Sequence, residues 1–241
     1  MEKENKIRIN KYLSQAGYCS RRKADRLLEQ GRITINGKIP ELGTKVGPGD
    51  EVRVNGKLVV NQEDEKSTYI AFNKPIGIVC TTDTKVEKDN IIDYINFPKR
   101  IYPIGRLDKA SEGLILLTDD GEIVNKILRS RNDQGKEYIV TVNKPITPDF
   151  LKGMANGVPI LDTVTKKCEV KQTGSQEFNI TLTQGLNRQI RRMCEFFDYK
   201  VEKLKRIRVI NIKLGNLAVG KYRHLAEEEL RELKKIVNAD Y

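Results

Sequence analysis

Asp108 is a carboxylate set between two cations, in the segment GRLDKASEGLILLTDDG of residues 105–121. Arg106 and Lys109 flank it, and four large aliphatic residues follow from Leu114. The segment predicts a loop that leads into a buried strand, and a loop carboxylate held by a rigid sheet is well placed to meet a substrate. Taken alone, an aspartate between an arginine and a lysine is more often part of a surface ion pair. On this segment by itself, both interpretations stay open.

A tyrosine and a group of arginines provide further chemistry. KEYIVTV predicts a strand with Tyr138 near its start, from which the phenol can face the same cleft as Asp108, although an ordinary half-buried tyrosine is the plainer interpretation. QGLNRQIRRMCEFF predicts a helix, and an arginine from it that reaches Asp108 would lower the carboxyl pKa and keep a nucleophile ionised. Arg188 and Arg192 on the same helix suit phosphate binding, so we expect the arginines to divide between the two roles.

The rest of the composition narrows the chemistry further. His224 is the only histidine, and the four cysteines contain no C-x-x-C pair, so neither a Ser-His-Asp triad nor a zinc site is expected. The glycine-rich motifs of nucleotide-binding loops do not occur. The sequence therefore predicts chemistry by carboxylate, tyrosine, lysine or arginine, with no cofactor and no metal.

The charge balance points to a polyanionic partner. The 241 residues carry 44 Lys and Arg against 33 Asp and Glu, a formal net charge of +11. Cations in such excess bind phosphates, because each contact releases condensed counterions, although solubility alone is a plainer explanation. The chain lacks an apolar run long enough to span a membrane, and MEKENKIRINKYL lacks the apolar run of a signal peptide, so we expect a cytoplasmic protein with no membrane partner.

A small basic module is predicted at residues 1–60. IRINKYLSQAG predicts a short helix, and a second helix should begin after Ser20 as N-cap and end at Gly31. Two Asn-Gly turns between alternating segments predict β-hairpins after these helices. The second helix carries four cations, three of them in the first turn where they oppose the helix dipole, so we expect a phosphate backbone to lie across that end: Arg21, Arg22, Lys23 and Arg26.

The polar stretch at residues 61–67 predicts a linker, and residues 68–241 a larger domain. Its strand-like segments include TYIAFNKP, GIVCTT, LILLT, KEYIVTV and EFNITLTQG, and helical segments such as TPDFLKGMANG and AEEELRELKKIV lie among them. Strands outnumber helices and several are joined by short turns. This pattern predicts an α+β fold in which helices flank a central, mainly antiparallel or mixed sheet.

Three segments together resemble a known family. GRLDKASEGLILLTDDGE, KEYIVTV and GLNRQIRRMCEFFDYKVEKLKRIRV follow, in that order, an N-terminal RINKYLSQAGYCSRRKADRLLEQGRITINGK. The combination resembles the RsuA-type ribosomal RNA pseudouridine synthases over essentially the whole chain. The N-terminal module then resembles an S4 RNA-binding domain, and the rest resembles a pseudouridine synthase catalytic domain.

The resemblance implies a role for each site residue. Asp108 is the catalytic aspartate, Tyr138 stacks on the target base and is a candidate to take its C5 proton, and Arg191 is the basic partner of the aspartate. Arg106 matches the arginine that fills the gap left by the flipped nucleotide, and Leu204 matches an apolar residue of the pocket. Whether the aspartate attacks the sugar, attacks the base or removes a sugar proton stays open.

The resemblance is strongest to a member that acts on large-subunit (23S) ribosomal RNA, so we expect this substrate and a monomeric enzyme. The same reaction on another RNA, 16S ribosomal RNA or a tRNA anticodon loop, is the alternative. A non-catalytic ribosome-assembly factor is less favoured, because binding alone does not require the Asp, Tyr and Arg set. An RNA hydrolase ranks last, because no cluster of metal-binding carboxylates is apparent.

Overall fold

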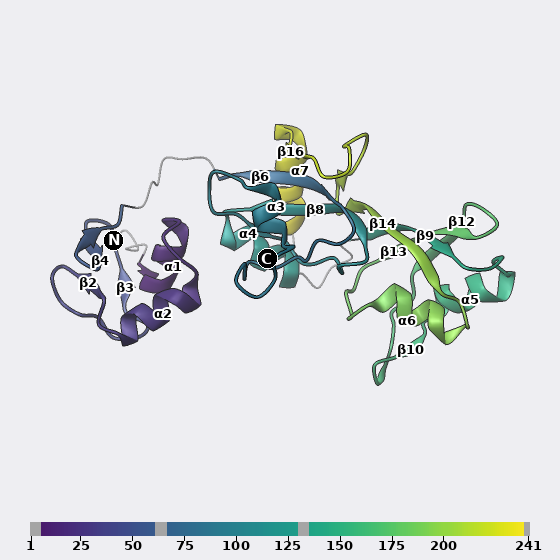
Figure 1. Ribbon diagram of the computed structural model, residues 1–241, viewed down its shortest axis with the longest axis horizontal. Coiled ribbons are helices and arrows are strands. Elements are labelled where there is room, and N and C mark those ends of the chain that lie inside the picture. The colour runs from purple at the N-terminus through teal and green to yellow at the C-terminus, as the bar shows by residue number, and fades with distance from the viewer. Residues whose placement is uncertain (1–5, 61–66, 130–134, 239–241) are drawn as a thin grey trace. The chain divides into compact units, whose positions relative to one another are not determined.

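The computed structural model describes residues 6–60, 67–129 and 135–238 (Figure 1). The chain divides into two compact units, Met1–Ser67 with Asp119–Gly121, and Thr68–Thr118 with Glu122–Tyr241. Nearly all of the stretch expected to be a linker, residues 61–66, lies outside the described residues, so that assignment stays a prediction.

The first unit packs two helices against short strands. Its elements are β1 (Ile7–Arg8), α1 (Ile9–Gln15), α2 (Arg21–Glu29), β2 (Ile33–Ile35), β3 (Lys45–Val46), β4 (Val52–Val54) and β5 (Lys57–Leu58). Strand β1 pairs with β3, and the other three form a sheet in the order β2-β4-β5. The core between helices and strands is aliphatic, and Ile9, Leu13 and Ile33 are completely buried in it.

Local sequence signals explain the shape of this unit. The Ser20 side chain accepts a hydrogen bond from the backbone N–H of Lys23 at 3.2 Å, which confirms the predicted N-cap of α2. Gly31, just past the helix, has φ +64°, as expected for a C′ glycine. The Asn36-Gly37 and Asn55-Gly56 pairs both have positive φ, which is the backbone of a tight hairpin turn.

The second unit is built on a nine-stranded sheet. Its strands are β6 (Tyr69–Lys74), β7 (Tyr102–Pro103), β8 (Glu112–Thr118), β9 (Lys136–Val142), β12 (Glu169–Gln172), β13 (Glu177–Leu182), β14 (Val201–Val209), β15 (Ile212–Lys213) and β16 (Tyr222–His224). The main path is β12-β13-β9-β14-β8-β6-β16, with β15 on β14 and β7 on β8. A separate two-stranded pair joins β10 (Pro159–Ile160) and β11 (Thr163–Val164). Only β14 and β8 pair in parallel among these strands, so the sheet is mixed, as predicted.

Helices cover both faces of this sheet. They are α3 (Ile91–Ile95), α4 (Gly121–Arg129), α5 (Pro148–Asn156), α6 (Gln189–Phe196) and α7 (Glu227–Asn238). Alternation along β8 separates the faces: Leu114 and Leu116 pack with α4 and α7, whereas Ile115 and Leu117 pack with α3. Helices α5 and α6 pack on β9, β13 and β14 in a further core. Tyr138 packs against both that core and the α3 core, so its ring lies where the two meet.

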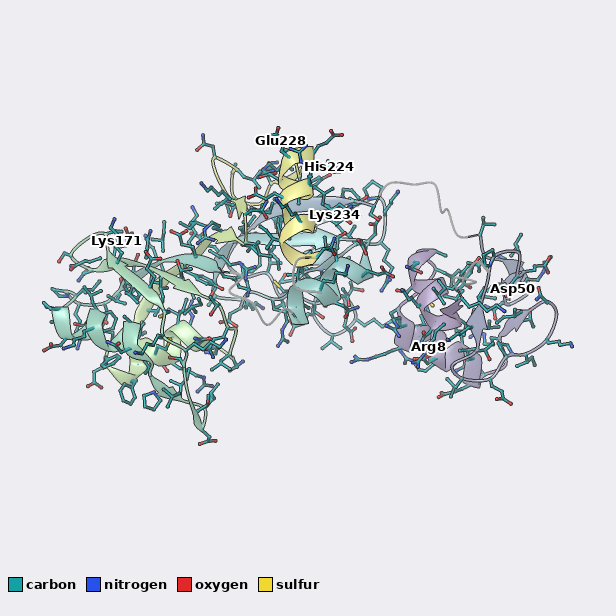
Figure 2. All side chains as sticks on the ribbon, turned by 180° about the vertical axis from the view of Figure 1, so that it is seen from behind. Arg8, Asp50, Lys171, His224, Glu228 and Lys234 are labelled. Carbon is teal, nitrogen blue, oxygen red and sulfur yellow. The ribbon has the colours of Figure 1, made fainter. Side chains whose placement is uncertain are left out.

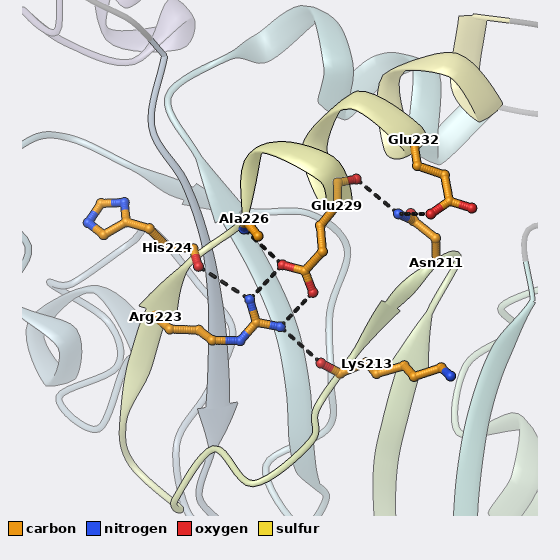
Figure 3. Close-up of polar contacts among 7 residues, drawn as sticks. All are labelled: Asn211, Lys213, Arg223, His224, Ala226, Glu229 and Glu232. Atoms are coloured by element: carbon orange, nitrogen blue, oxygen red, sulfur yellow. Dashed lines mark hydrogen bonds and ion pairs between the residues drawn. The ribbon is translucent and has the colours of Figure 1, made fainter.

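An ion pair fastens the sheet edge to the last helix. In Figure 3, Arg223 of β16 donates from its two terminal nitrogens to Glu229 of α7, at 2.6 and 2.8 Å. Glu229 also accepts from the backbone N–H of Ala226, so the same carboxylate caps the helix. The hydrogen bonds from Arg223 lower the pKa of Glu229 below its usual value. Figure 2 shows the neighbouring His224 on β16 and Glu228 and Lys234 on α7.

One predicted strand is wrong. GIVCTT at residues 77–82 forms a loop with a single bridge between Val79 and Asn90. Its apolar residues are used for side-chain packing, because Cys80 is buried against α3 and its Sγ accepts from the backbone N–H of Leu107. In the described part of the chain, no helix has the length and apolar character needed to cross a membrane.

Candidate active site

A cleft of about 910 Å³ opens in the second unit and contains most of the residues singled out from the sequence. Asp108, Tyr138, Leu204, Arg106 and Arg188 all line it. They come from the loop before β8, from β9 and β14, and from the start of α6. Residues that lie far apart along the chain therefore share one concave surface, where a substrate would be enclosed.

Asp108 lies in the loop before β8, as predicted. The backbone N–H of Ser111 donates to its carbonyl at 3.0 Å, which closes the turn into the strand. The half-buried carboxylate takes part in no hydrogen bond or ion pair with any residue that the structure describes. Lys109 lies 3.9 Å from Asp89 instead. The surface ion pair considered for Asp108 therefore does not form, and its carboxylate is available to a substrate.

Arg191 lies beneath the Asp108 loop and does not line the cleft. Its side chain is buried, and its terminal nitrogens donate to the carbonyls of Val201 and Ala110 and to the Ser111 hydroxyl. The expected direct contact with the Asp108 carboxylate is not formed. Burial and nearby Arg188 lower the pKa of Arg191, while the Asp108 charge acts in the opposite direction. Arg191 thus holds the Asp108 loop through the backbone carbonyl of Ala110 and the Ser111 hydroxyl.

The register of three central strands sets the floor of the cleft. Arg206 of β14 lies opposite Tyr138 of β9 on one side and opposite Gly113 of β8 on the other. Directly opposite residues of antiparallel strands point to the same face, so Tyr138 and Arg206 point together into the cleft. Leu204, two residues before Arg206, lines the same face.

A bulge in β14 keeps the next residues on that face. The pairing shifts between Arg206 and Arg208, so that Ile207 has no partner in the register with β9. Val209 then lies opposite Lys136, and both line the cleft beside Arg206. Without the extra residue, Arg206 and Val209 would point to opposite faces.

Sequence reasoning missed several cations at this site. Among the residues described as lining the cleft, Asp108 is the only acid, and there are six cations: Arg106, Lys109, Lys136, Lys166, Arg188 and Arg206. Lys136 and Arg206 lie two residues from Tyr138 and Leu204 in their strands, and this period of two was the available signal. Lys74 is completely buried behind them and donates to the Pro75 carbonyl at 2.8 Å. Burial lowers the pKa of Lys74, against the nearby charge of Asp108.

The remaining predicted contact residues are exposed or partly exposed. Arg188 precedes α6 with φ +49° and its side chain is exposed, as is that of Arg106. Arg192 is half-buried and does not line the cleft, but it donates to the side chain and carbonyl of Asn187, which does line it. In the first unit, all four predicted cations of α2 are exposed: Arg21, Arg22, Lys23 and Arg26.

Comparison with known proteins shows the family of this chain. A model of the RNA pseudouridylate synthases matches residues 68–196, and a model of the S4 domain matches residues 7–52. The chain belongs to the RNA pseudouridine synthase family. The family and the fold predicted from the sequence are thereby confirmed, and with them an isomerase that converts uridine to pseudouridine in RNA.

The matches to individual relatives cover almost the whole chain. The dual-specificity RNA pseudouridine synthase RluF of Escherichia coli (strain K12) is 55% identical over 234 residues, covering 97% of this chain and 80% of that protein. The ribosomal large subunit pseudouridine synthase B of Bacillus subtilis (strain 168) is 34% identical, covering 96% and 97%. A crystal structure of a pseudouridylate synthase matches with a TM-score of 0.68 at 27% identity, covering 94% and 99%.

Proposed function

We propose that this synthase isomerises one uridine of large-subunit (23S) ribosomal RNA, with Asp108 as the catalytic residue. The similarity to the ribosomal large subunit pseudouridine synthase B of Bacillus subtilis supports the substrate. The single observation that supports the catalytic role is the placement of Asp108, which offers an unpaired carboxylate in a cleft whose other described charged residues are all cations. RluF is named as dual-specificity, and on that basis a tRNA with a similar loop is a second substrate to test.

The reaction sets requirements that the cleft can meet. The N1–C1′ bond breaks, the uracil turns, and C5 bonds to C1′, so the base has to leave the RNA stack and stay enclosed. The Tyr138 ring offers a stacking surface, and exposed Arg106 at the rim is positioned to occupy the vacated space. Leu204 supplies an apolar wall, and Arg191 holds the Asp108 loop through Ala110.

We assign RNA binding outside the cleft to the first unit. The exposed cations of α2 suit a phosphate backbone, which explains why three of them tolerate the unfavourable end of the helix dipole. Arg188 and Arg192 would add phosphate contacts near the cleft. We keep residues 1–60 as the RNA-binding domain, 61–67 as linker and 68–241 as catalytic domain, in a monomer that works where ribosomal RNA is found, in the cytoplasm.

The first experiment measures tritium release from RNA labelled at uracil C5, with no added metal or nucleotide. Wild-type protein should release tritium from large-subunit RNA, and Asp108→Asn should abolish release. Asp89→Asn is the matched control, because that carboxylate is nearby, exposed and paired only with Lys109 at 3.9 Å. Equal release by wild type and Asp108→Asn would refute the catalytic role. Release from total RNA but none from large-subunit RNA would refute the substrate.

A further inference from the structure

Arg206 is a buried cation with unused hydrogen-bond donors. The side chain is only 3% exposed, on the central strand β14. Its Nε donates to the carbonyl of Leu114 at 2.6 Å, which fixes the plane of the guanidinium. The two terminal amino groups donate to no residue in the described ranges, although the side chain lines the cleft. Burying a cation without a full set of protein acceptors is costly, and the terminal amino groups of Arg206 face the cleft, where a ligand can accept their hydrogen bonds.

Lys136 adds a second cation on the same wall. It lines the cleft two residues before Tyr138, on the strand paired with Arg206, and makes no hydrogen bond or ion pair with any described residue. Burial, followed by the charge of Arg206, lowers the pKa of Lys136. The two cations therefore repel each other across the same space. An anion held between them would relieve that repulsion.

We propose that Arg206, assisted by Lys136, binds the carbonyl oxygens of the flipped uracil and stabilises the negative charge that develops on the base. Phosphates are unsuitable for this position, because the exposed cations that can meet the RNA backbone are at the rim: Arg106, Lys109 and Arg188. A flipped base enclosed in the cleft would lie on the sheet floor beside Tyr138. The role rests on the family's reaction and is independent of which RNA carries the uridine.

The charge balance of the reaction fits this site. In the route through C1′, an Asp108 oxygen bonds to C1′ as the N1–C1′ bond breaks, and its electron pair stays on uracil as an anion. C5 then bonds to C1′ and releases the carboxylate, while C5 loses a proton and N1 gains one. If Asp108 instead attacks the base or removes a sugar proton, negative charge still gathers on the uracil oxygens. A guanidinium fork aimed at them stabilises the transition state more than the neutral base.

The test compares Arg206→Met and Arg206→Lys with Arg208→Met. Arg208 is on the same strand but pairs with Glu137 and does not line the cleft, so it controls for the loss of an arginine from β14. Tritium release should show kcat reduced about 10²–10³-fold in Arg206→Met, as for loss of an oxyanion donor, with KM little changed. Arg206→Lys should recover part of kcat because it restores the charge. Thermal melting shows whether each variant is folded.

A second substrate separates leaving-group stabilisation from a structural effect. Fluorine at C5 makes uracil a better leaving group, so RNA with 5-fluorouridine needs less help from Arg206. Loss of 5-fluorouridine from nuclease digests should show a smaller defect for Arg206→Met than tritium release does. Equal defects on both substrates, or a raised KM with unchanged kcat, would overturn the proposal. Wild-type protein that modifies no RNA in total cellular RNA would overturn it together with the proposed function.

Discussion

Gly113→Ala tests whether the close approach of β8 to β14 builds the cleft floor. Gly113 lies opposite Arg206 in the parallel ladder, with φ +107°. A Cβ at this position would lie 2.7 Å from the backbone nitrogen of Arg206 and closer still to its carbonyl oxygen. These atoms belong to a central strand and cannot rotate away as a flexible side chain would. The two strands would have to separate at Arg206, the residue whose terminal amino groups have no described partner.

The expected loss of stability in Gly113→Ala has two parts. Forcing an extra methyl group into a packed interior costs about 1–3 kcal/mol. Holding a residue with a Cβ at positive φ costs a further ~1–3 kcal/mol. The free energy of unfolding should therefore fall by about 2–6 kcal/mol, a large part of the roughly 5–15 kcal/mol of an ordinary protein. Activity of the folded fraction should fall as well, because Arg206 and Tyr138 share that point of the register.

Gly77→Ala is the matched control. Gly77 has a comparable φ of +92°, but a Cβ there would meet nothing within 4 Å. Only the backbone cost of about 1–3 kcal/mol applies to it. The difference in free energy of unfolding between the two variants therefore measures the cost of the contact between β8 and β14.

Hydrogen exchange followed by mass spectrometry measures the loss of stability in the second unit, which contains β8 and β14. Peptides from β8 and β14 report the opening free energy of the sheet, so unfolding of the first unit does not confuse the result. Gly113→Ala should speed exchange in both strands far more than Gly77→Ala does. Equal exchange in the two variants would refute the reasoning, since it would mean that the strands absorb the methyl group without separating.

Three further predictions concern the Tyr138 hydroxyl, the cations of α2 and the ion pair of Glu229. Tyr138→Phe should retain RNA affinity but lose turnover if the hydroxyl takes the C5 proton. Tritium release by this variant at the wild-type rate would show that the ring is a stacking surface only. Arg21→Glu with Arg22→Glu should weaken RNA binding and flatten its salt dependence, and an unchanged slope would exclude α2 from the RNA contact. Glu229→Gln should remove stability, roughly 1 kcal/mol, that wild type has above pH 4.5 and loses as pH falls through the lowered pKa of Glu229. The gap between their unfolding curves should therefore close in acid, and a gap that persists there would contradict this assignment.

Local signals explain what the sequence could predict. The Ser20 cap, the Gly31 stop and the Asn36-Gly37 turn each depend on one or two residues whose backbone preference decides the outcome. Asp108 in a loop before a buried strand follows in the same way, from an apolar run preceded by polar residues. The strand prediction for GIVCTT was wrong because periodicity does not distinguish a strand from a loop whose apolar side chains, such as that of Cys80, pack into a core.

The cleft itself depends on pairings between distant segments. Arg191 was expected at the Asp108 carboxylate, but the path of the loop brings the Ala110 carbonyl and Ser111 hydroxyl to its guanidinium instead. The sequence did not indicate a role for Arg206, because it lies in a basic segment among other lysines and arginines. Its role depends on lying opposite Tyr138 and Gly113, and no local pattern encodes which strands become neighbours.

The bulge at Ile207 shows why spacing alone misleads here. In a regular strand, residues two apart share a face, so Arg206 and Arg208 would both line the cleft. With one extra residue between them, Arg206 stays opposite Tyr138, while Arg208 meets Glu137 on the other side of β9 at 2.9 Å. Of two arginines with similar sequence surroundings, one is neutralised by a carboxylate and the other keeps its terminal donors unpaired. It is this difference in pairing that makes Arg206 the one available to a developing negative charge.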